Sequence, residues 1–379
     1  MSQPEAMRST FYFLPRRTSM GCEIARRAVL SHSARKPTTR GTMAVRQNAE
    51  EGWSVMGTGT IATEHMVAAI RAMGHSPLWV VSKSRADAIH FSNDLGIPQA
   101  TTDLERVWSD PAVKFVYISA SLKRRQHYVL AAADAGKHIL CDGPLSEDSK
   151  TAKRLDKHCA DSGVVLAVNQ PLRASAIHQT MRRLVLEGEI GSIQSLSILR
   201  GGPFQPPPNR RGEMPHNGGN VYLDVCAEDI DLARFLTGAE PVEAIAFARE
   251  SNGSPNHLAY TIRMDDGGLL QAHESFGTAD IESMVVAAGT DGVLIASGTL
   301  SSRGSGVLVR RLAGRNELVP VRERDLHTAT LEEFVGAARN EASPLATGMD
   351  SFASLVATEA VASAARTGRA TAIRPGESA

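Results

Sequence analysis

The chain has 379 residues, a length that predicts two domains rather than one. Hydrophobic residues make up 42% and charged residues 22% of the sequence, which excludes a disordered chain, and no apolar run is long enough to span a membrane. The 41 basic and 41 acidic residues balance to a formal net charge of zero, which argues against nucleic acid as the main partner.

The cysteines bear on the cellular setting. The 4 cysteines lie far apart and form no C-x-x-C pair, which argues against a disulfide framework or a zinc site. They are typical of buried or free thiols in a reducing compartment, so we expect a cytoplasmic protein. No group of residues has the spacing of metal ligands, and no metal is assigned.

Residues 1–48 differ in composition from the rest of the chain. They carry nine Lys and Arg residues against two acids, which leaves 32 basic and 39 acidic residues, a net charge of −7, in the remainder. Three interpretations stay open for this leader: a disordered tail, an Arg- and Ser-rich transit-like peptide, or sequence upstream of the true start, with Met43 as the initiator. No long apolar segment follows the basic residues, so a secretory signal is excluded, and residues 1–48 are left out of the predicted fold.

A strand, a glycine turn and a helix open the organised part of the chain. The apolar run 53–56 is followed by a helical pattern that stops at Gly74, and a second apolar run, 78–81, completes a strand–helix–strand unit. The intervening G-x-G-x-x-A pattern is a variant of the dinucleotide-binding fingerprint, whose glycines let the backbone approach a pyrophosphate. The residues predicted to bind it are Gly57, Thr58, Gly59, Thr60 and Ile61. The alternative is a tight turn that binds nothing.

Further strands and helices alternate along the first half. Strands are predicted at residues 115–119, 138–141 and 164–168, with helices over 125–135 and from Ser146. This alternation predicts a parallel, doubly wound sheet, in which ligands bind beyond the carboxyl ends of the strands. The rule directs attention to residues 82–85, 120–123, 142–144 and 169–173. From these segments we assign Asp142 and Pro144 to the cofactor site, and Asn169 and Arg173 to the substrate site. A structural salt bridge is the alternative for Arg173.

The end of the second strand bears on the choice of cofactor. An NAD site usually has an Asp or Glu there to hold the ribose 2′-hydroxyl, whereas this chain has Ser82, Lys83, Ser84 and Arg85. Hydroxyl and cationic groups suit a 2′-phosphate, so Ser82, Lys83 and Arg85 favour NADP over NAD. A solvated basic turn is the alternative.

The pattern changes after Pro171. The sequence predicts a strand at 193–199, a Gly- and Pro-rich loop over 201–219, a helix over 221–236 and a final helix over 351–365. Between the last two lie strand candidates that predict a mostly antiparallel open sheet, at 242–248, 258–263, 269–276, 284–288, 293–297 and 307–312. In the loop, Arg210 and Arg211 are candidates for substrate binding, with two solvated cations as the alternative.

Three motifs in this order resemble the Gfo/Idh/MocA oxidoreductase family. They are Gly57-Thr-Gly-Thr-Ile-Ala62, Ala135-Gly-Lys-His-Ile-Leu-Cys141 and Ala346-Thr-Gly-Met-Asp350. The resemblance covers residues 52 to 375 and implies a Rossmann domain at 49–170 and an α/β domain at 171–379, whose open sheet serves substrate binding and oligomerisation. It also implies hydride transfer between a nicotinamide and a sugar, anhydrosugar or cyclitol carbon, with a small polyol or sugar-like molecule as the substrate, in a homo-oligomer.

The chain departs from the family pattern at three positions. Members of the family have Glu-Lys-Pro where this chain has Asp142-Gly143-Pro144, so the family lysine that contacts substrate and nicotinamide is absent. In the second motif Asp224 and Asp231 match, but Glu228 stands at the position of the catalytic histidine. Leu122 replaces the asparagine of an Asn-x-x-His stretch that helps to hold the cofactor.

These losses leave two hypotheses for function. Asp224 and Glu228 are spaced i, i+4 and would share a helix face, where mutual repulsion would keep one carboxyl protonated as the acid for catalysis. Two solvated acids are the alternative. The chain is then either an NADP-dependent oxidoreductase or a degenerate member of the family that binds a nucleotide or a partner protein without catalysing hydride transfer.

Overall fold

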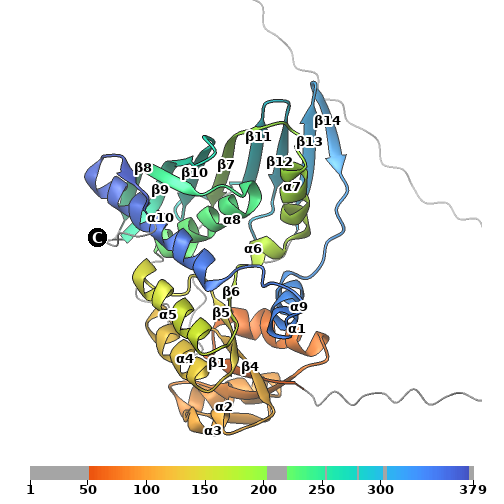
Figure 1. The fold of residues 1–379 in the computed structure, drawn as a ribbon, viewed down its shortest axis with the longest axis vertical. Helices are drawn as coiled ribbons and strands as arrows, with labels where there is room; N and C mark the ends of the chain where they lie inside the picture. Colours follow the sequence, from red (N-terminus) through yellow and green to blue (C-terminus); the bar gives the residue numbers. More distant parts are fainter. Residues whose placement is uncertain (1–50, 203–219, 252–253, 280, 302–304, 375–379) are drawn as a thin grey trace, which may run out of the picture. The chain divides into compact units, whose positions relative to one another are not determined.

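The computed structural model describes residues 51–202, 220–251, 254–279, 281–301 and 305–374 (Figure 1). The leader at residues 1–48 and the loop candidates Arg210 and Arg211 lie outside these ranges. Within them the chain forms two β-sheets with helices packed against each, which confirms the predicted α/β fold class.

The first sheet has six parallel strands. They are β1 (Gly52–Met56), β2 (Ser76–Val81), β3 (Gln99–Thr101), β4 (Val113–Ile118), β5 (His138–Asp142) and β6 (Leu166–Asn169). Their order across the sheet is β3-β2-β1-β4-β5-β6, which is that of a doubly wound Rossmann sheet. The central strand β1 is buried along its whole length, as expected where helices cover both faces of a parallel sheet.

Helices connect these strands, and those that the sequence predicted lie close to the predicted positions. The connecting helices are η1 (Ala62–Met66), its continuation α1 (Val67–Ala72), α2 (Arg85–Leu95), α3 (Glu105–Trp108), α4 (Leu122–Asp134) and α5 (Ser149–Asp161). The sequence analysis missed α2, β3 and α3. α2 is polar along most of its length and buries only Ala88, Phe91 and Ser92, so its apolar periodicity is weak.

One predicted helix start is wrong. The helix expected from Ser146 begins at Ser149, because the Asp148 carboxylate accepts a hydrogen bond from the Thr151 backbone N–H and caps the helix there. Glu147 therefore precedes the helix, and Asp148 is its cap.

The second sheet has nine strands and is mostly antiparallel. They are β7 (Ile193–Gly201), β8 (Pro241–Ser251), β9 (Ser254–Met264), β10 (Leu269–Ser275), β11 (Met284–Gly289), β12 (Gly292–Ser297), β13 (Val307–Leu312), β14 (Arg315–Val319) and β15 (Thr371–Ala372). The order is β14-β13-β12-β11-β7-β10-β9-β8-β15, and β7 pairs with β10 in parallel while the other neighbouring strands pair antiparallel. The open, mostly antiparallel sheet is confirmed, although β14 and β15 were not predicted.

Helices of the second half cover one face of this sheet. They are α6 (Pro171–Ala174), α7 (Ala176–Leu186), η2 (Tyr222–Cys226), α8 (Ala227–Thr237) and α10 (Gly348–Thr367). Apolar residues of α7, α8 and α10 pack against alternate residues of the strands in one continuous core.

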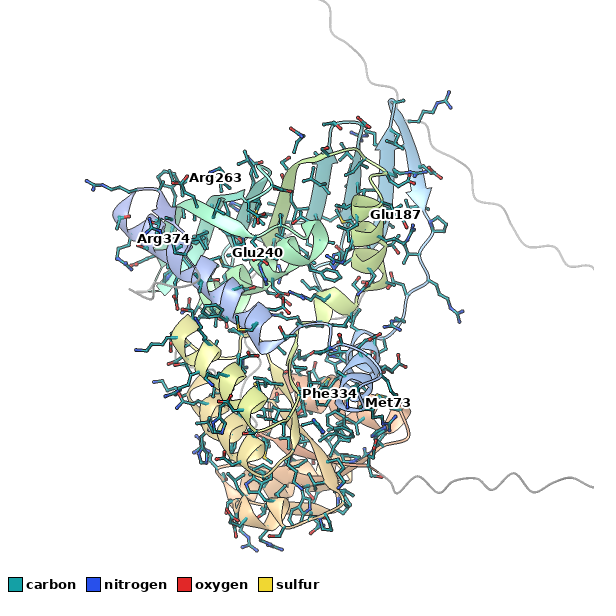
Figure 2. All side chains as sticks on the ribbon, viewed as in Figure 1. Met73, Glu187, Glu240, Arg263, Phe334 and Arg374 are labelled. Atoms are coloured by element: carbon teal, nitrogen blue, oxygen red, sulfur yellow. The ribbon has the colours of Figure 1, made fainter. Side chains whose placement is uncertain are left out.

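Helix α9 (Leu326–Ala338) and the first part of α10 bring the chain back to the first sheet before β15 joins the second. In α9, Leu331, Phe334 and Val335 join the core that contains Trp53 and Phe115, and α9 lies beside α1 (Figure 1). Figure 2 shows Phe334 and Met73 close together at this contact.

A second set of contacts links α10 to α5. The Glu359 carboxylate accepts hydrogen bonds from the Ser149 backbone N–H at 2.7 Å and the Ser149 hydroxyl at 2.8 Å. Nearby, the Ser351 hydroxyl accepts a bond from the Leu145 N–H at 3.1 Å. Residues more than two hundred positions apart in the sequence therefore share one set of hydrogen bonds at the cap of α5.

The packing of α9 against the first sheet can be tested at Phe334. Its ring is 1% exposed and lies 5.6 Å from the ring of Trp53 and 5.8 Å from that of Phe115. We expect Phe334→Ala to lower the free energy of unfolding by about 3 to 5 kcal/mol, because it leaves a cavity among large rings. Urea unfolding followed by tryptophan fluorescence measures the change. Phe247→Ala, at a ring that is 73% exposed, is the matched control, and an equal effect of the two variants contradicts the assignment.

Candidate functional site

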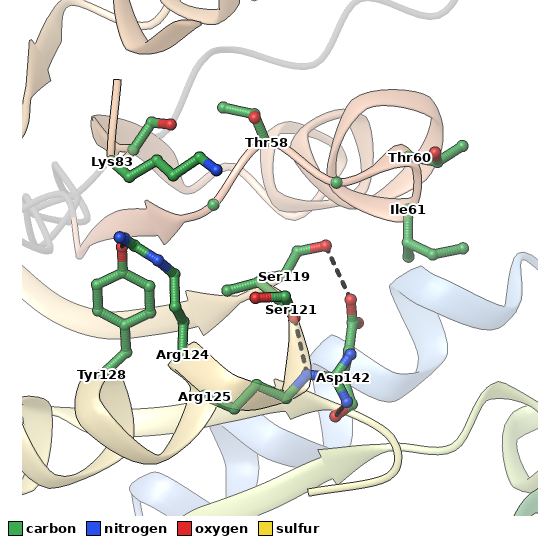
Figure 3. A pocket seen from close by; sticks show the side chains of 14 residues that line it. Thr58, Thr60, Ile61, Lys83, Ser119, Ser121, Arg124, Arg125, Tyr128 and Asp142 are labelled. Carbon is green, nitrogen blue, oxygen red and sulfur yellow. Dashed lines mark hydrogen bonds between the residues drawn. The ribbon is translucent and has the colours of Figure 1, made fainter. Parts of the chain in front are cut away.

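A cleft of about 450 Å³ lies at the carboxyl ends of β1, β2, β4 and β5. Its wall is formed by Gly57, Thr58, Gly59, Thr60, Ile61, Ser82, Lys83, Ser119, Ala120, Ser121, Arg124, Arg125, Tyr128 and Asp142 (Figure 3). This is the edge at which a doubly wound sheet binds its ligand, and the glycine turn of the fingerprint lies on it.

The two glycines of the turn cannot be exchanged for larger residues without a clash. Gly57 has a φ of +99°, and a Cβ on it would collide with the backbone carbonyl of Ser119. A Cβ on Gly59 would lie 2.5 Å from the Ser119 hydroxyl oxygen. The backbone of the turn therefore runs directly against the end of β4, and the start of the η1–α1 helix faces the cleft. This geometry fits the pyrophosphate of a dinucleotide.

The predicted cofactor residues divide into those that line the cleft and those that do not. Residues 57–61, Ser82 and Lys83 line it, and Asp142 lies at its far end. Arg85 is exposed at the start of α2 and is not part of the wall, and Pro144 belongs to the neighbouring pocket described below.

Sequence analysis missed Arg124 and Tyr128 as cleft residues. The Arg124 guanidinium donates to the Tyr128 hydroxyl at 3.2 Å, and Figure 3 shows this pair facing Lys83 across one end of the cleft. Both residues lie in the first two turns of α4, directly after β4. The position beyond a strand end was a usable signal, but the spacing of Arg124 and Tyr128 within a helix gave no indication of which face they occupy.

The Asp142 carboxylate is held by three donors from neighbouring strands. It accepts hydrogen bonds from the Tyr117 hydroxyl at 2.5 Å and the Ser119 hydroxyl at 2.8 Å, and from the Asn169 amide at 3.1 Å. Burial and the adjacent carboxylate raise the pKa of Tyr117 well above its usual value, so its hydroxyl stays protonated and donates.

Arg125 fixes the backbone that follows β5. Its guanidinium donates to the carbonyl oxygens of Ala120 at 2.9 Å and Asp142 at 2.8 Å, and also to that of Pro144. A cation on α4 therefore ties together the chain segments that follow β4 and β5. Arg125 stands at the histidine position of the family's Asn-x-x-His stretch, whose asparagine position holds Leu122.

A second pocket of about 250 Å³ adjoins the cleft. Ile61, Arg125 and Asp142 belong to the walls of both cavities. The rest of its wall is formed by Gly143, Pro144, Asn169, Gln170, Pro171, Leu223, Asp224, Ala227, Glu228 and His327. A ligand in the second pocket would therefore lie next to the end of a dinucleotide bound in the cleft.

Comparison with known proteins decides the family. Residues 52–170 match the profile of the oxidoreductase family with the NAD-binding Rossmann fold, and residues 178–295 match that of the GFO/IDH/MocA C-terminal domain. The 1,5-anhydro-D-fructose reductase of Ensifer adhaerens is 32% identical over 331 residues, which are 86% of this chain and 99% of the reductase. The chain belongs to the Gfo/Idh/MocA oxidoreductase family.

Two more distant similarities agree with this. The D-xylose 1-dehydrogenase (NADP(+)) 2 of Haloferax volcanii is 26% identical over 248 residues, 65% of this chain and 75% of that protein. The crystal structure of aldose-aldose oxidoreductase from Caulobacter crescentus complexed with glycerol has a TM-score of 0.76 and 20% identity, and it covers 85% of this chain and 99% of that chain. This last similarity supports the fold alone.

The structure also bears on membranes and metals. Across the described ranges, no helix is both long and apolar enough to cross a membrane. In the same parts of the chain, His, Cys, Asp and Glu side chains form no group of three or more that would hold a metal ion.

In this Gfo/Idh/MocA protein, Gly143 stands at the position of the family lysine, and it lies beside Gln170. A Cβ on Gly143 would lie 3.0 Å from the Gln170 side-chain nitrogen, so the Gln170 amide packs where a side chain at 143 would begin. Gln170 follows β6 and lines the second pocket. The space that a longer side chain would enter is therefore partly taken by a neutral amide.

Asp224 and Glu228 both line the second pocket, in agreement with their predicted common helix face. Glu228 accepts a hydrogen bond from Arg200 at 2.7 Å, and Asp224 accepts one from the Asn220 backbone N–H at 2.6 Å. Partial desolvation by the surrounding groups raises the pKa of Asp224, while the Asn220 hydrogen bond and the Arg125 charge oppose the increase. The residue stays accessible to solvent, which screens these effects. Desolvation, rather than repulsion by Glu228, is the cause of the increase. The catalytic roles of Asp224 and Glu228 stay a prediction.

The two candidates for substrate binding within the described ranges lie in different places. Asn169 lines the second pocket, and its side-chain oxygen is buried with no hydrogen-bond partner among the described residues. Arg173 lies behind the wall, where it forms a buried ion pair with Asp231 at 2.7 Å and a second one with Asp350 at 3.1 Å. Arg173 therefore links α6, α8 and α10, and it is not part of the pocket wall.

A buried polar network lies behind Glu228. Arg200 forms ion pairs with Glu228 at 2.7 Å and Asp229 at 2.5 Å, and Tyr260 donates to Glu274 at 2.8 Å. Burial raises the pKa of Asp229 to about 7, and burial together with the Asp229 charge raises that of Glu274 well above its usual value. These two neighbouring carboxyls therefore retain a proton over the acidic pH range in which an exposed carboxyl loses it.

This network makes a prediction about stability and pH. The folded chain holds a proton that the unfolded chain releases near its ordinary carboxyl pKa, so the network's contribution to stability is present at low pH and is lost as pH rises towards neutrality. Glu274→Gln keeps an acceptor for the hydrogen bond from Tyr260 but does not titrate. We expect it to reduce the loss of stability that accompanies the rise in pH. Its Tm should exceed that of the parent by about 2 °C or more at about pH 8, and by less at about pH 5.

Thermal unfolding at both pH values measures this difference. Glu243→Gln is the matched control, since Glu243 pairs with Arg263 at the surface and 44% of its side chain is exposed. Parallel pH dependence of the parent and Glu274→Gln contradicts the shared proton.

Proposed function

We propose that the chain is an NADP-dependent oxidoreductase that transfers hydride between the nicotinamide and a carbonyl or alcohol carbon of a sugar, anhydrosugar or cyclitol. One observation supports this most: the cleft beside the glycine turn shares Ile61, Arg125 and Asp142 with a second, polar pocket. Hydride transfer requires two ligands in contact, and these cavities are contiguous at the carboxyl ends of the strands. The 1,5-anhydro-D-fructose reductase and the D-xylose dehydrogenase to which the chain is similar are named for sugar-type substrates.

The charges that line the cleft favour NADP over NAD as the cofactor. Lys83 and Ser82 line the cleft at the end of β2, and Arg124 adds a second cation across from Lys83 (Figure 3). Among the described residues that line the cleft, Asp142 is the one carboxylate, and it lies at the end remote from Lys83. A ribose 2′-phosphate is favoured by two cations and no nearby acid. Arg85, at the start of α2, would add to the field from outside the wall.

The second pocket is the proposed substrate site. The free oxygen of Asn169 and the carboxylates of Asp224 and Glu228 are hydrogen-bond acceptors, which suit a ligand rich in hydroxyl groups. Bound in the cleft, a nicotinamide would supply or accept the hydride. Asp224 and Glu228 are the predicted catalytic pair, and Arg200 holds Glu228 in place. A substrate role for Arg210 and Arg211, and assembly into a homo-oligomer, stay predictions.

The proposal is tested first by cofactor binding. We expect a fluorescence titration of the full chain to give micromolar binding of NADPH and binding of NADH that is weaker by about tenfold or more. Turnover is then sought with NADPH and 1,5-anhydro-D-fructose, and with NADP and D-xylose or myo-inositol. Binding of NADPH without turnover of any of them favours the degenerate family member, for which Gly143 and Glu228 are the supporting observations. Absence of binding of either nucleotide contradicts the oxidoreductase and leaves a degenerate family member that acts through a partner protein.

Lys83 gives a specific prediction about this preference. Because its ammonium group would face the 2′-phosphate, Lys83→Ala should weaken NADPH binding by about tenfold or more and change NADH binding by less than about threefold. The same titration measures both. Lys114→Ala is the matched control, since Lys114 is exposed near the amino end of β4, whereas the cleft lies at the carboxyl ends of the strands. Equal losses for NADPH and NADH would place Lys83 elsewhere on the dinucleotide.

A further inference from the structure

The proposed reaction needs a proton as well as a hydride. When a carbonyl carbon gains hydride, its oxygen develops negative charge and takes up a proton, and the reverse reaction releases one. The lysine and histidine positions of the family hold Gly143 and Glu228 here, and Glu228 is already bound to Arg200. Asp224 already accepts a hydrogen bond from the Asn220 backbone N–H. The question is which remaining group in the second pocket is free to exchange a proton.

His327 meets this requirement. It lies in the first turn of α9, its side chain lines the second pocket, and the residue is 1% exposed. Neither of its ring nitrogens has a hydrogen-bond partner among the residues that the structure describes. A buried imidazole is rarely left with both nitrogens unpaired, because each lost hydrogen bond to water costs free energy. A ligand in the second pocket would supply the missing partner.

The position of the ring is fixed from two sides. The Asp325 carboxylate caps α9 by accepting a hydrogen bond from the Thr328 N–H at 2.7 Å, which sets the start of the helix. The ring of His65, from η1, stacks on that of His327 with centroids 4.6 Å apart and planes inclined by 15°. Further along α9, Phe334 packs into the core of the first sheet. The imidazole is therefore held rather than mobile, as a group that must meet a reacting atom requires.

The charges around His327 come from several elements. The groups are His65 from η1, Asp142 from β5, Asp325 beside the helix start, Arg125 from α4, and Asp224 and Glu228 from η2 and α8. Burial lowers the pKa of His327 most, and His65 lowers it further, whereas Asp325 and Asp142 raise it. The ring is therefore neutral near pH 7, with one N–H to donate and one lone pair to accept.

We propose that His327 is a catalytic residue that exchanges a proton with the reacting oxygen of the substrate; this rests on the proposed function. In the oxidising direction, the neutral imidazole accepts the alcohol proton as the hydride leaves carbon and the C=O bond forms. In the reducing direction, the carbonyl carbon gains the hydride, the π electrons of the C=O bond pass to oxygen, and the imidazolium gives that oxygen its proton. The dinucleotide is oxidised as the carbonyl is reduced, so electrons and protons balance.

His327→Gln tests the proposal by kinetics, because glutamine retains hydrogen-bonding atoms but does not titrate. With NADPH and 1,5-anhydro-D-fructose, we expect kcat to fall by about 100-fold and KM to change by less than about threefold. The parent's kcat/KM should fall as pH rises through the pKa of the imidazole, and the variant should lack this limb. NADPH binding and the melting temperature report whether the variant is folded, and His327→Asn is the second variant.

Two other variants separate His327 from its neighbours. His158→Gln alters an exposed histidine that pairs with Asp134, and it should leave kcat unchanged. Asp224→Asn removes the competing acid of the pocket. Loss of the pH limb in Asp224→Asn together with its retention in His327→Gln overturns the proposal, as does activity of His327→Gln within about threefold of the parent.

A readout without turnover separates this inference from the proposed function. The NMR signal of His327 is identified as the one that is absent from His327→Gln. In histidine-labelled protein without nucleotide, this signal should titrate below the ordinary histidine range. Addition of 1,5-anhydro-D-fructose and NADP should then shift it. If the parent reduces none of the proposed substrates, the proposed function fails, whereas a shifted His327 signal still supports contact with the ligand. A signal that stays in place under both additions overturns the inference.

Discussion

The wall between the two cavities depends on the Asp142 carboxylate. It accepts hydrogen bonds from Tyr117, Ser119 and Asn169, which lie at the carboxyl ends of β4 and β6 on either side of β5. Without these donors a carboxylate buried at the end of a parallel strand would be unfavourable. Arg125 completes the arrangement by binding the carbonyl oxygen of the same residue. The cleft and the second pocket are therefore formed by one continuous hydrogen-bond system rather than by independent loops.

The second constraint is the return of the chain from the second sheet to the first. α9 contributes His327 to the second pocket and Phe334 to the core around Trp53, so one helix couples the pocket to the packing of the first sheet. α10 contributes Asp350 to the ion pairs of Arg173. Changes far from the pocket along α9 can therefore displace the pocket wall.

The sequence predicted the fold better than the site, for identifiable reasons. Buried parallel strands and glycine turns leave strong local patterns, so β1, β4 and β5 were found, whereas the polar helix α2 was missed because it buries few residues. The cleft residues 57–61 followed from one local motif. His327 was missed because nothing nearby in sequence marks it, and its role follows from where α9 packs. A structural salt bridge was one of two alternatives for Arg173, and no local signal shows that Asp231 and Asp350 are its partners.

The replacement of the family lysine and histidine changes how charge must be handled in the second pocket. Among its described wall residues, Arg125 is the one cation, and its guanidinium is bound to backbone carbonyls. Asp224 and Glu228 add negative charge, so an alkoxide forming there would be stabilised poorly. Proton transfer that accompanies hydride transfer avoids this charge, because the oxygen is never fully ionised. A pocket of this composition therefore favours a titrating group held against the reacting oxygen over a fixed cation.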